Sequence, residues 1–168
     1  MKKLILSKPL RIIKAKKLLE EELKIKLEFS EREVSFSGNS ETEYVAEKVL
    51  EAIDFGFPIG AALMIEEEDL ILEFLSIKEY TKKKDYERIR GRIIGKEGKT
   101  KKTIMSLTGC FIELKDNRVG LLGRPENVKN ARQAVISIIQ GTKQANVYAY
   151  LEHHRPLPDE IADLDIEK

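Results

Sequence analysis

Two stretches of the chain share one hydrophobic pattern, which predicts a β-hairpin followed by a helix. Over residues 25–36, apolar side chains alternate with polar ones on both sides of a polar turn, the two-residue period of a hairpin with one buried face. Residues 45–53 change to a helical period, and Ser40 and Glu43 have the spacing of a capping box at the start of that helix. The same succession returns over residues 111–141.

A shift of the chain against itself by 85 positions, without gaps, superimposes the two stretches. Six aligned pairs are identical: Glu28 and Glu113, Val34 and Val119, Gly38 and Gly123, Glu41 and Glu126, Ala46 and Ala131, and Ile53 and Ile138. Lys16 and Lys17 likewise fall on Lys101 and Lys102. The chain is therefore predicted to contain a duplicated module.

Further elements precede each hairpin. A short helix is expected over residues 15–22 in the first copy and over 99–107 in the second. The second copy adds a strand at 71–77 and a basic amphipathic helix at 85–94, which gives the order strand, helix, glycine turn, helix, strand, strand, helix. In the first copy, little chain remains for a helix before residue 14.

The pattern divides the chain into three parts. We predict a degenerate module with a connecting helix at residues 1–70 and an intact module at 71–152. The remainder, 153–168, is predicted to be an acidic and disordered tail, because it is rich in carboxylates and proline and has no hydrophobic period.

The formal net charge of +1 hides an uneven distribution of charge along the chain. Residues 1–80 carry 12 basic and 17 acidic side chains, whereas residues 81–155 carry 17 basic and 7 acidic ones. A net charge of +10 confined to one segment favours a polyanion-binding surface there.

Composition argues against several other classes of site. Cys110 is the only cysteine, so no intramolecular disulfide forms, and we interpret it as a small apolar filler rather than a nucleophile. His153 and His154 are adjacent, so their side chains do not converge on one helix face. We expect no metal site and no cofactor.

Enzymatic and membrane functions are also disfavoured. Gly98-Lys99-Thr100 resembles the end of the phosphate-binding loop of nucleotide hydrolases, but Ile93 stands where that motif requires glycine. No cluster of acid and base residues is evident. Without a signal peptide or a long apolar run, the chain is expected to be a cytoplasmic, non-enzymatic protein that does not enter membranes.

The turn from Gly95 to Gly98 is the strongest candidate for a binding site. Two glycines remove the side-chain bulk that would hold a phosphate away from the main chain, and glycine accepts positive φ. The following helix points free N–H groups at an anion, and the surrounding lysines attract phosphates whatever the base. We predict that this turn clamps single-stranded RNA, with the bases in an apolar groove beside it. The predicted RNA-binding residues are Arg88, Arg90, Arg92, Ile93, Ile94, Gly95, Lys96, Glu97, Gly98, Lys99, Lys101, Lys102 and Ile112.

The order of elements and the Gly-x-x-Gly turn resemble a type I KH domain, in which such a turn clamps four nucleotides. The resemblance implies an α+β fold of two tandem type I KH domains (β-α-α-β-β-α). In the gapless alignment, Leu10-Arg11-Ile12-Ile13 falls on the turn, so the first domain is expected to be degenerate and without Gly-x-x-Gly.

A narrower resemblance rests on the run from Gly91 to Lys101 with its distinctive Gly-Lys-Thr-Lys, together with a scatter of downstream residues. These downstream residues are Thr103-Ile104, Thr108, Leu121 to Gly123, Asn127, Ala131-Arg132, Ala134-Val135, Gly141 and Val147-Tyr148. The second module is similar to the KH proteins that partner the Nob endonuclease in assembly of the small ribosomal subunit. This implies an archaeal, monomeric protein that binds near the 3′ end of the small-subunit rRNA, with a Nob-type endonuclease or a translation initiation factor subunit as protein partner.

Two other functions remain open at this level. The chain can be an interaction scaffold that docks a nuclease or translation factor through its acidic first module, with RNA binding secondary. An RNA-processing enzyme is the weaker alternative, since no metal or acid-base cluster supports one.

Overall fold

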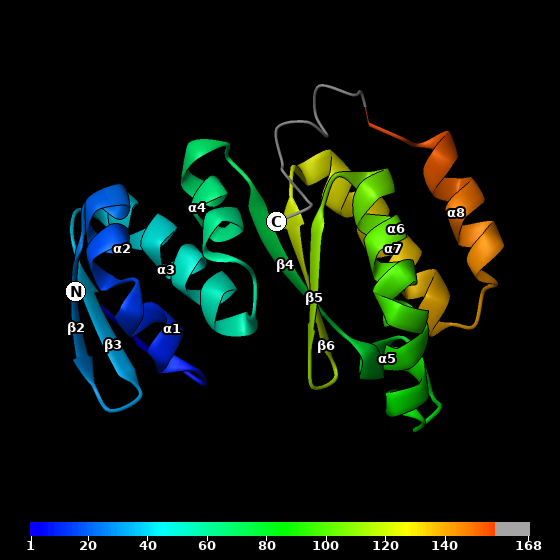
Figure 1. Cartoon of the computed structure of the whole chain (residues 1–168), viewed down its shortest axis with the longest axis horizontal. Helices are drawn as coiled ribbons and strands as arrows, with labels where there is room; N and C mark the ends of the chain where they lie inside the picture. Colours follow the sequence, from blue (N-terminus) through cyan, green and yellow to red (C-terminus); the bar gives the residue numbers. More distant parts are fainter. Residues whose placement is uncertain (157–168) are drawn as a thin grey trace. The chain divides into compact units, whose positions relative to one another are not determined.

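The computed structural model describes residues 1–156, and the part of the predicted tail from residue 157 onward lies outside the described residues. The chain divides into two compact units, Met1–Leu70 and Ile71–Lys168. In each unit, helices cover one face of a three-stranded antiparallel sheet (Figure 1). The predicted α+β fold with duplicated β-α-α-β-β-α order is confirmed.

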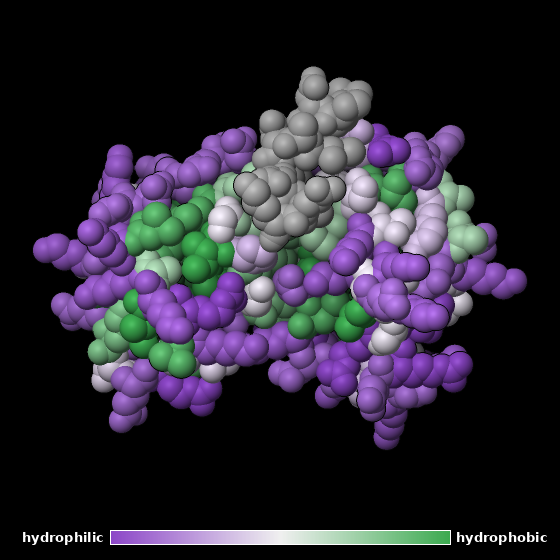
Figure 2. All heavy atoms as spheres, in the orientation of Figure 1, coloured by the Kyte–Doolittle hydropathy of each residue, from purple (hydrophilic) through white to green (hydrophobic). Residues whose placement is uncertain are grey.

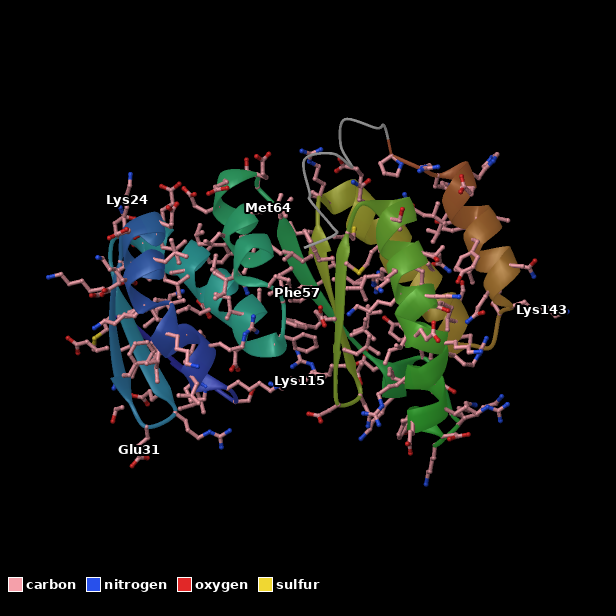
Figure 3. The ribbon with its side chains drawn as sticks, in the orientation of Figure 1. Lys24, Glu31, Phe57, Met64, Lys115 and Lys143 are labelled. Carbon is pink, nitrogen blue, oxygen red and sulfur yellow. The ribbon has the colours of Figure 1, made fainter. Side chains whose placement is uncertain are left out.

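The first unit has its strands in the order β1-β3-β2. Its elements are β1 (Lys2–Ile5), α1 (Pro9–Lys14), α2 (Lys16–Leu23), β2 (Lys26–Ser30), β3 (Glu33–Ser37), α3 (Ser40–Phe55) and α4 (Ile59–Glu67). Lys24 and Glu31, at opposite ends of β2 (Figure 3), both have positive φ, 54° and 56°, so they reverse the chain before and after this strand.

The second unit repeats the topology as β4-β6-β5. Its elements are β4 (Ile71–Ser76), the 3-10 turn η1 (Ile77–Glu79), α5 (Tyr86–Ile94), the 3-10 turn η2 (Lys96–Gly98), α6 (Lys99–Thr108), β5 (Phe111–Lys115), β6 (Arg118–Gly123), α7 (Pro125–Ile139) and α8 (Gln144–His153). Asp116, with a φ of 54°, makes the same hairpin turn as Glu31.

Equivalent side chains form the two cores. Val34, Ala46 and Ile53 are fully buried, as are their partners in the 85-position alignment. Those partners are Val119, Ala131 and Ile138. A fully buried valine or isoleucine side chain contributes about 1.5–3 kcal/mol, so these repeated positions stabilise both units in the same way. Figure 2 shows the complementary surface, where hydrophilic side chains make up most of the visible face of each unit.

The start of α3 differs from our expectation. The N-cap is Asn39, whose side-chain oxygen accepts a hydrogen bond from the Thr42 N–H at 2.9 Å, so the capping box predicted at Ser40 is wrong by one residue. The Glu43 carboxylate accepts from the Gly38 N–H at 3.2 Å. This bond and the nearby N-terminal ammonium lower the pKa of Glu43.

The expectation that the first copy lacks a helix before residue 14 was also wrong. Pro9 begins the six-residue helix α1, where its fixed φ suits the first turn and its missing N–H costs nothing. Ile12 of this helix is fully buried.

The structure corrects the gapless alignment at the first strands. Ile5 pairs with Glu33 in one sheet and Ser76 pairs with Arg118 in the other. Because Glu33 and Arg118 are equivalent, Ile5 corresponds to Ser76, a shift of 71 positions rather than 85.

Two arginines show that the first helices of the two units, α1 and α5, are equivalent. Arg11 of α1 donates hydrogen bonds to two main-chain carbonyls near the end of α3, and Arg92 of α5 does the same near the end of α7. The acceptors are Ile53 and Phe57 for Arg11, at 2.7 and 2.9 Å, and Ile138 and Thr142 for Arg92, both at 2.9 Å. Since the acceptors are themselves 85 positions apart, Arg11 corresponds to Arg92, a shift of 81.

The described residues contain no helix long and apolar enough to cross a membrane.

Candidate nucleic-acid interface

The glycine turn reverses the chain between α5 and α6 within four residues. Positive φ occurs at Gly95 (78°), Glu97 (56°) and Gly98 (75°), and the Gly98 N–H donates to the Gly95 carbonyl at 3.1 Å. A non-glycine residue at positive φ is uncommon, so Glu97 marks a strained point of the turn.

The two glycines serve different purposes. A Cβ at Gly95 would clash with the side chain and main-chain nitrogen of Thr100, so this glycine permits tight packing. A Cβ at Gly98 would meet only Lys102 Cε, at 4.0 Å. Space does not require a glycine at Gly98. The positive φ of Gly98 favours glycine, and the absence of a side chain leaves the main chain at this position uncovered.

The N-terminus of α6 has no side-chain cap. Gly98 is the N-cap and offers no side chain to cap the helix. The Lys99 N–H donates to the Lys96 carbonyl, and the next N–H groups of this ten-residue helix have no acceptor within α6. Such an end attracts anions. Lys96, Lys99 and Lys102 are exposed around it, and among the described residues no carboxylate is paired with any of them.

Helix α8 braces the turn from behind, a role that our sequence reasoning missed. Gln144 donates from its amide nitrogen to Thr100 Oγ1 at 3.0 Å and to the Arg92 carbonyl at 3.4 Å. Thr100 is 4% exposed. No sequence signal pointed to Gln144, because it lies 44 positions from Thr100.

Arg92 holds the fold together rather than presenting its charge to solvent. Its two terminal nitrogens are both bonded to main-chain carbonyls, and Arg11 makes the equivalent bonds in a unit that lacks the turn. We therefore leave Arg92 out of the phosphate-binding set. Arg88 is exposed, and the half-buried Arg90 donates to the Asp116 carbonyl at 3.1 Å.

Of the three isoleucines predicted to contact RNA, only Ile94 reaches the surface, with 38% of its area exposed. Ile93 and Ile112 are both 0% exposed. Their prediction as contacts was wrong, because each points into the core of the second unit, where it supports the surface without forming part of it.

Lys101 has a carboxylate partner beside the turn. Its ammonium lies 3.3 Å from a carboxylate oxygen of Glu113 on the edge strand β5, and both side chains are about a quarter exposed, 24% and 27%. The predicted phosphate contact at Lys101 therefore competes with an internal ion pair.

Cys110 lies directly before β5, and its thiol is unreactive. Its thiol is buried beside Gly123, and desolvation raises its pKa to about 12. A thiol that stays protonated at neutral pH is a poor nucleophile. Within residues 1–156, no group of three or more His, Cys, Asp and Glu side chains is placed to hold a metal ion.

The first unit lacks the turn because its chain is four residues shorter at this point. Thirteen positions separate Arg11 from Lys24, the residue with positive φ that ends α2, whereas seventeen separate Arg92 from Gly109, which ends α6. The four missing residues match the length of Gly-x-x-Gly. Substitution at positions 10–13, as the gapless alignment implied, is therefore wrong, since those residues form α1.

An antiparallel sheet in the order β4-β6-β5, with two helices joined by a Gly-x-x-Gly turn and a third packed behind, defines a type I KH domain. A family model for the second KH domain of PNO1 proteins, described as a eukaryotic-type (type I) KH domain, matches residues 71–156. The chain belongs to this PNO1 family of type I KH-domain proteins.

Curated relatives agree with this family, and a solved structure shares the fold. A KH domain-containing protein of Methanocaldococcus jannaschii is 33% identical over 147 residues, which are 83% of this chain and 65% of that protein. The pre-rRNA-processing protein PNO1 of Candida albicans is 36% identical over 105 residues, 61% of this chain and 38% of that protein. This chain thus spans less than two thirds of the curated relatives it matches.

A solved complex of a/eIF2alpha, aDim2p and rRNA from Pyrococcus horikoshii contains a chain similar to this one. The TM-score is 0.81 at 24% identity, and the match covers 91% of this chain and 92% of that one. At this identity the likeness establishes the fold.

Proposed function

We propose that this chain is a single-stranded RNA-binding protein of small-subunit ribosome assembly, which holds RNA near the 3′ end of the small-subunit rRNA. One observation carries the proposal: the bare Gly98 and the uncapped start of α6 lie in the segment with a net charge of +10. The names of the relatives support it, since one is a pre-rRNA-processing protein and one structure contains rRNA.

The geometry supports the following proposed set of RNA-binding residues. Gly95 and Gly98 shape the clamp, Glu97 completes its turn, and Ile94 offers an apolar surface to a base. The cations that hold phosphates are Lys96, Lys99, Lys102, Arg88 and Arg90, with Lys101 available once it leaves Glu113. In the proposed role these groups bind and orient RNA without cleaving it. A cytoplasmic location and a monomeric state are further parts of the proposal.

Salt dependence tests the proposal on the full chain. If four phosphates are neutralised, the logarithm of affinity for a single-stranded oligoribonucleotide should fall with the logarithm of salt with a slope of about −3. Fluorescence anisotropy titrations between low and physiological salt would measure it. A slope near zero, or cleavage of the oligonucleotide on addition of Mg²⁺, would contradict the proposal.

A second function is favoured for the first unit. On the unit's first two helices, Leu10, Ile13 and Leu18 are 66%, 40% and 44% exposed, although the unit has no turn to clamp RNA. Apolar side chains gathered on a surface indicate protein contacts. We propose that this unit docks a protein, with a translation initiation factor subunit or a Nob-type endonuclease as candidates; the solved complex that contains a/eIF2alpha supports the former.

Replacing Glu113 with glutamine is expected to strengthen RNA binding about fivefold. The change frees Lys101 for a phosphate and removes a negative charge beside the clamp; one exposed charge contact is worth up to about 1 kcal/mol. Equilibrium titration of the variant with a short oligoribonucleotide measures the effect. The Lys101→Met, Glu113→Gln double variant is the control and should lose the gain. Weaker binding by Glu113→Gln alone would show that the carboxylate itself contacts RNA.

A further inference from the structure

The second unit contains a segment between β4 and α5 that the first unit lacks. Ile5 corresponds to Ser76, and Arg11 corresponds to Arg92. Arg11 follows Ile5 by six positions, whereas Arg92 follows Ser76 by sixteen. Six of the ten additional residues precede α5, because three residues lie between Ile5 and Pro9 whereas nine lie between Ser76 and Tyr86; the other four lengthen the helix itself. The segment before α5 contains three consecutive lysines. We call residues 81–85 the lysine loop, which contains Lys82, Lys83 and Lys84.

Side-chain contacts anchor both ends of this segment. On one side, the Tyr80 hydroxyl accepts a hydrogen bond from Arg132 of α7 at 3.2 Å. On the other, the Lys78 ammonium lies 5.5 Å from the centre of the Tyr86 ring. Within the loop, the Lys83 N–H donates to Thr81 Oγ1 at 3.1 Å. The lysine loop is therefore a positioned feature of the second unit.

The charges of the lysine loop point into solvent and are not neutralised. All three lysines are exposed, and no carboxylate among the described residues is paired with them. The nearest acidic residues in sequence are Asp85 and Glu87, so the segment from Lys82 to Arg88 keeps a net charge of +2. Such a patch favours a polyanion.

An exposed face of α5 connects the loop with the clamp. Inside α5, Arg88 and Gly91 are three residues apart and share one helix face, and Gly95 follows at the C-cap four residues after Gly91. Lys84 lies in the lysine loop, two residues before Tyr86, the first residue of the helix. Arg88 and Gly91 are exposed. The exposed face of α5 therefore has the lysine loop at its N-terminal end and the Gly-x-x-Gly turn at its C-terminal end.

Gly91 is unexplained by the fold alone. Glycine inside a helix costs about 0.5–1 kcal/mol relative to alanine, and a Cβ at this position would meet no atom within 4 Å. Its φ is not positive. The equivalent position in the first unit is Leu10, whose side chain is 66% exposed. A bare helix surface lets a polymer backbone lie close to α5.

We propose that an RNA strand held at the clamp continues along this face of α5 to the lysine loop, which makes the binding site longer than four nucleotides. This inference rests on the proposed RNA-binding function. Helix α5 has nine residues and is about 13 Å long at 1.5 Å per residue, whereas charges are screened over about 8 Å at physiological salt. The loop therefore acts only on RNA that reaches it.

RNA length provides the test. The full chain and its Lys82→Gln, Lys83→Gln, Lys84→Gln variant would be titrated with a tetranucleotide and with a twelve-nucleotide single strand that contains the same four bases. The loop variant should bind the longer RNA about tenfold more weakly than the unchanged chain near physiological salt, with a salt slope shallower by about 2, the value for three lost phosphate contacts. Its affinity for the tetranucleotide should stay within about twofold, since the loop lies beyond the screening length.

A matched variant controls for net charge. Lys8→Gln, Lys24→Gln, Lys26→Gln removes the same three charges from exposed positions of the first unit, which has no Gly-x-x-Gly turn, and should leave both affinities within about twofold. Equal affinity of the loop variant and the unchanged chain for the longer RNA would overturn the inference, as would equal losses on both RNAs. If the loop variant keeps its RNA affinity but loses binding to polyglutamate, the loop contacts protein instead. Failure of the unchanged chain to bind either RNA would remove the proposed function itself.

Discussion

Replacing Gly98 with aspartate is expected to abolish RNA binding while the second unit stays folded. The new carboxylate would lie at the start of α6, which has no side-chain cap and where a phosphate is proposed to bind, so its negative charge would repel that phosphate. A Cβ has room there, with no atom nearer than 4.0 Å. Aspartate tolerates positive φ better than most residues, so the cost to folding should be about 1–2 kcal/mol. RNA affinity should fall at least about a hundredfold, the loss of several phosphate contacts.

Gly98→Asn is the matched control, because asparagine has the same shape and the same tolerance of positive φ but no charge. It should retain measurable affinity, and both variants should melt within a few degrees of each other. Titration with an oligoribonucleotide and circular dichroism melts give the two readouts. Unchanged affinity of Gly98→Asp would place the clamp elsewhere, and equal losses in both variants would show that bulk, not charge, decides.

Replacing Ile12 with aspartate is expected to unfold the first unit. Ile12 is 0% exposed and packs inside the unit from α1. A buried carboxylate without a partner costs several kcal/mol, and the lost isoleucine adds about 2–5 kcal/mol. The two costs together come to about 5 kcal/mol or more, which matches the whole stability of a small domain, at the low end of about 5–15 kcal/mol, so this unit should be largely unfolded.

Hydrogen exchange read residue by residue would show the effect as lost protection in β1 to β3, with protection in β4 to β6 retained. Ile13→Asp is the control, since the neighbouring Ile13 is 40% exposed and its replacement should change stability by less than about 1 kcal/mol. Normal protection of the first unit in Ile12→Asp would contradict the burial of this helix face.

The local elements were predictable because their signals lie between near neighbours. Val34 and Phe36 alternate with polar residues, and this two-residue period alone identifies a half-buried strand. Pro125 and Gly141 similarly marked the limits of α7 to within two residues. The clamp was also readable, because Gly95, Gly98 and the following helix are adjacent in sequence.

The alignment of the two copies could not be read from sequence without gaps. Identities after residue 28 are dense enough to set the shift of 85, but the earlier segments share few residues, so an incorrect shift looked acceptable there. The strand pairing of Ile5 and the hydrogen bonds of Arg11 gave the correct alignment of these earlier segments. They show that the second unit has both the turn and the residues before α5 that the first unit lacks.

The duplicated hairpin and helix, the glycine turn and the concentration of positive charge in one copy were determined by the amino-acid sequence alone. Each is a matter of residue type at short spacing. Tertiary structure decided which side chains of that region face solvent. Arg92 looked like a phosphate ligand until its guanidinium was found bonded 46 and 50 residues away, and Ile93 and Ile112 proved to be interior. A long polar side chain takes whichever acceptor the fold brings within reach, and no local pattern records that choice.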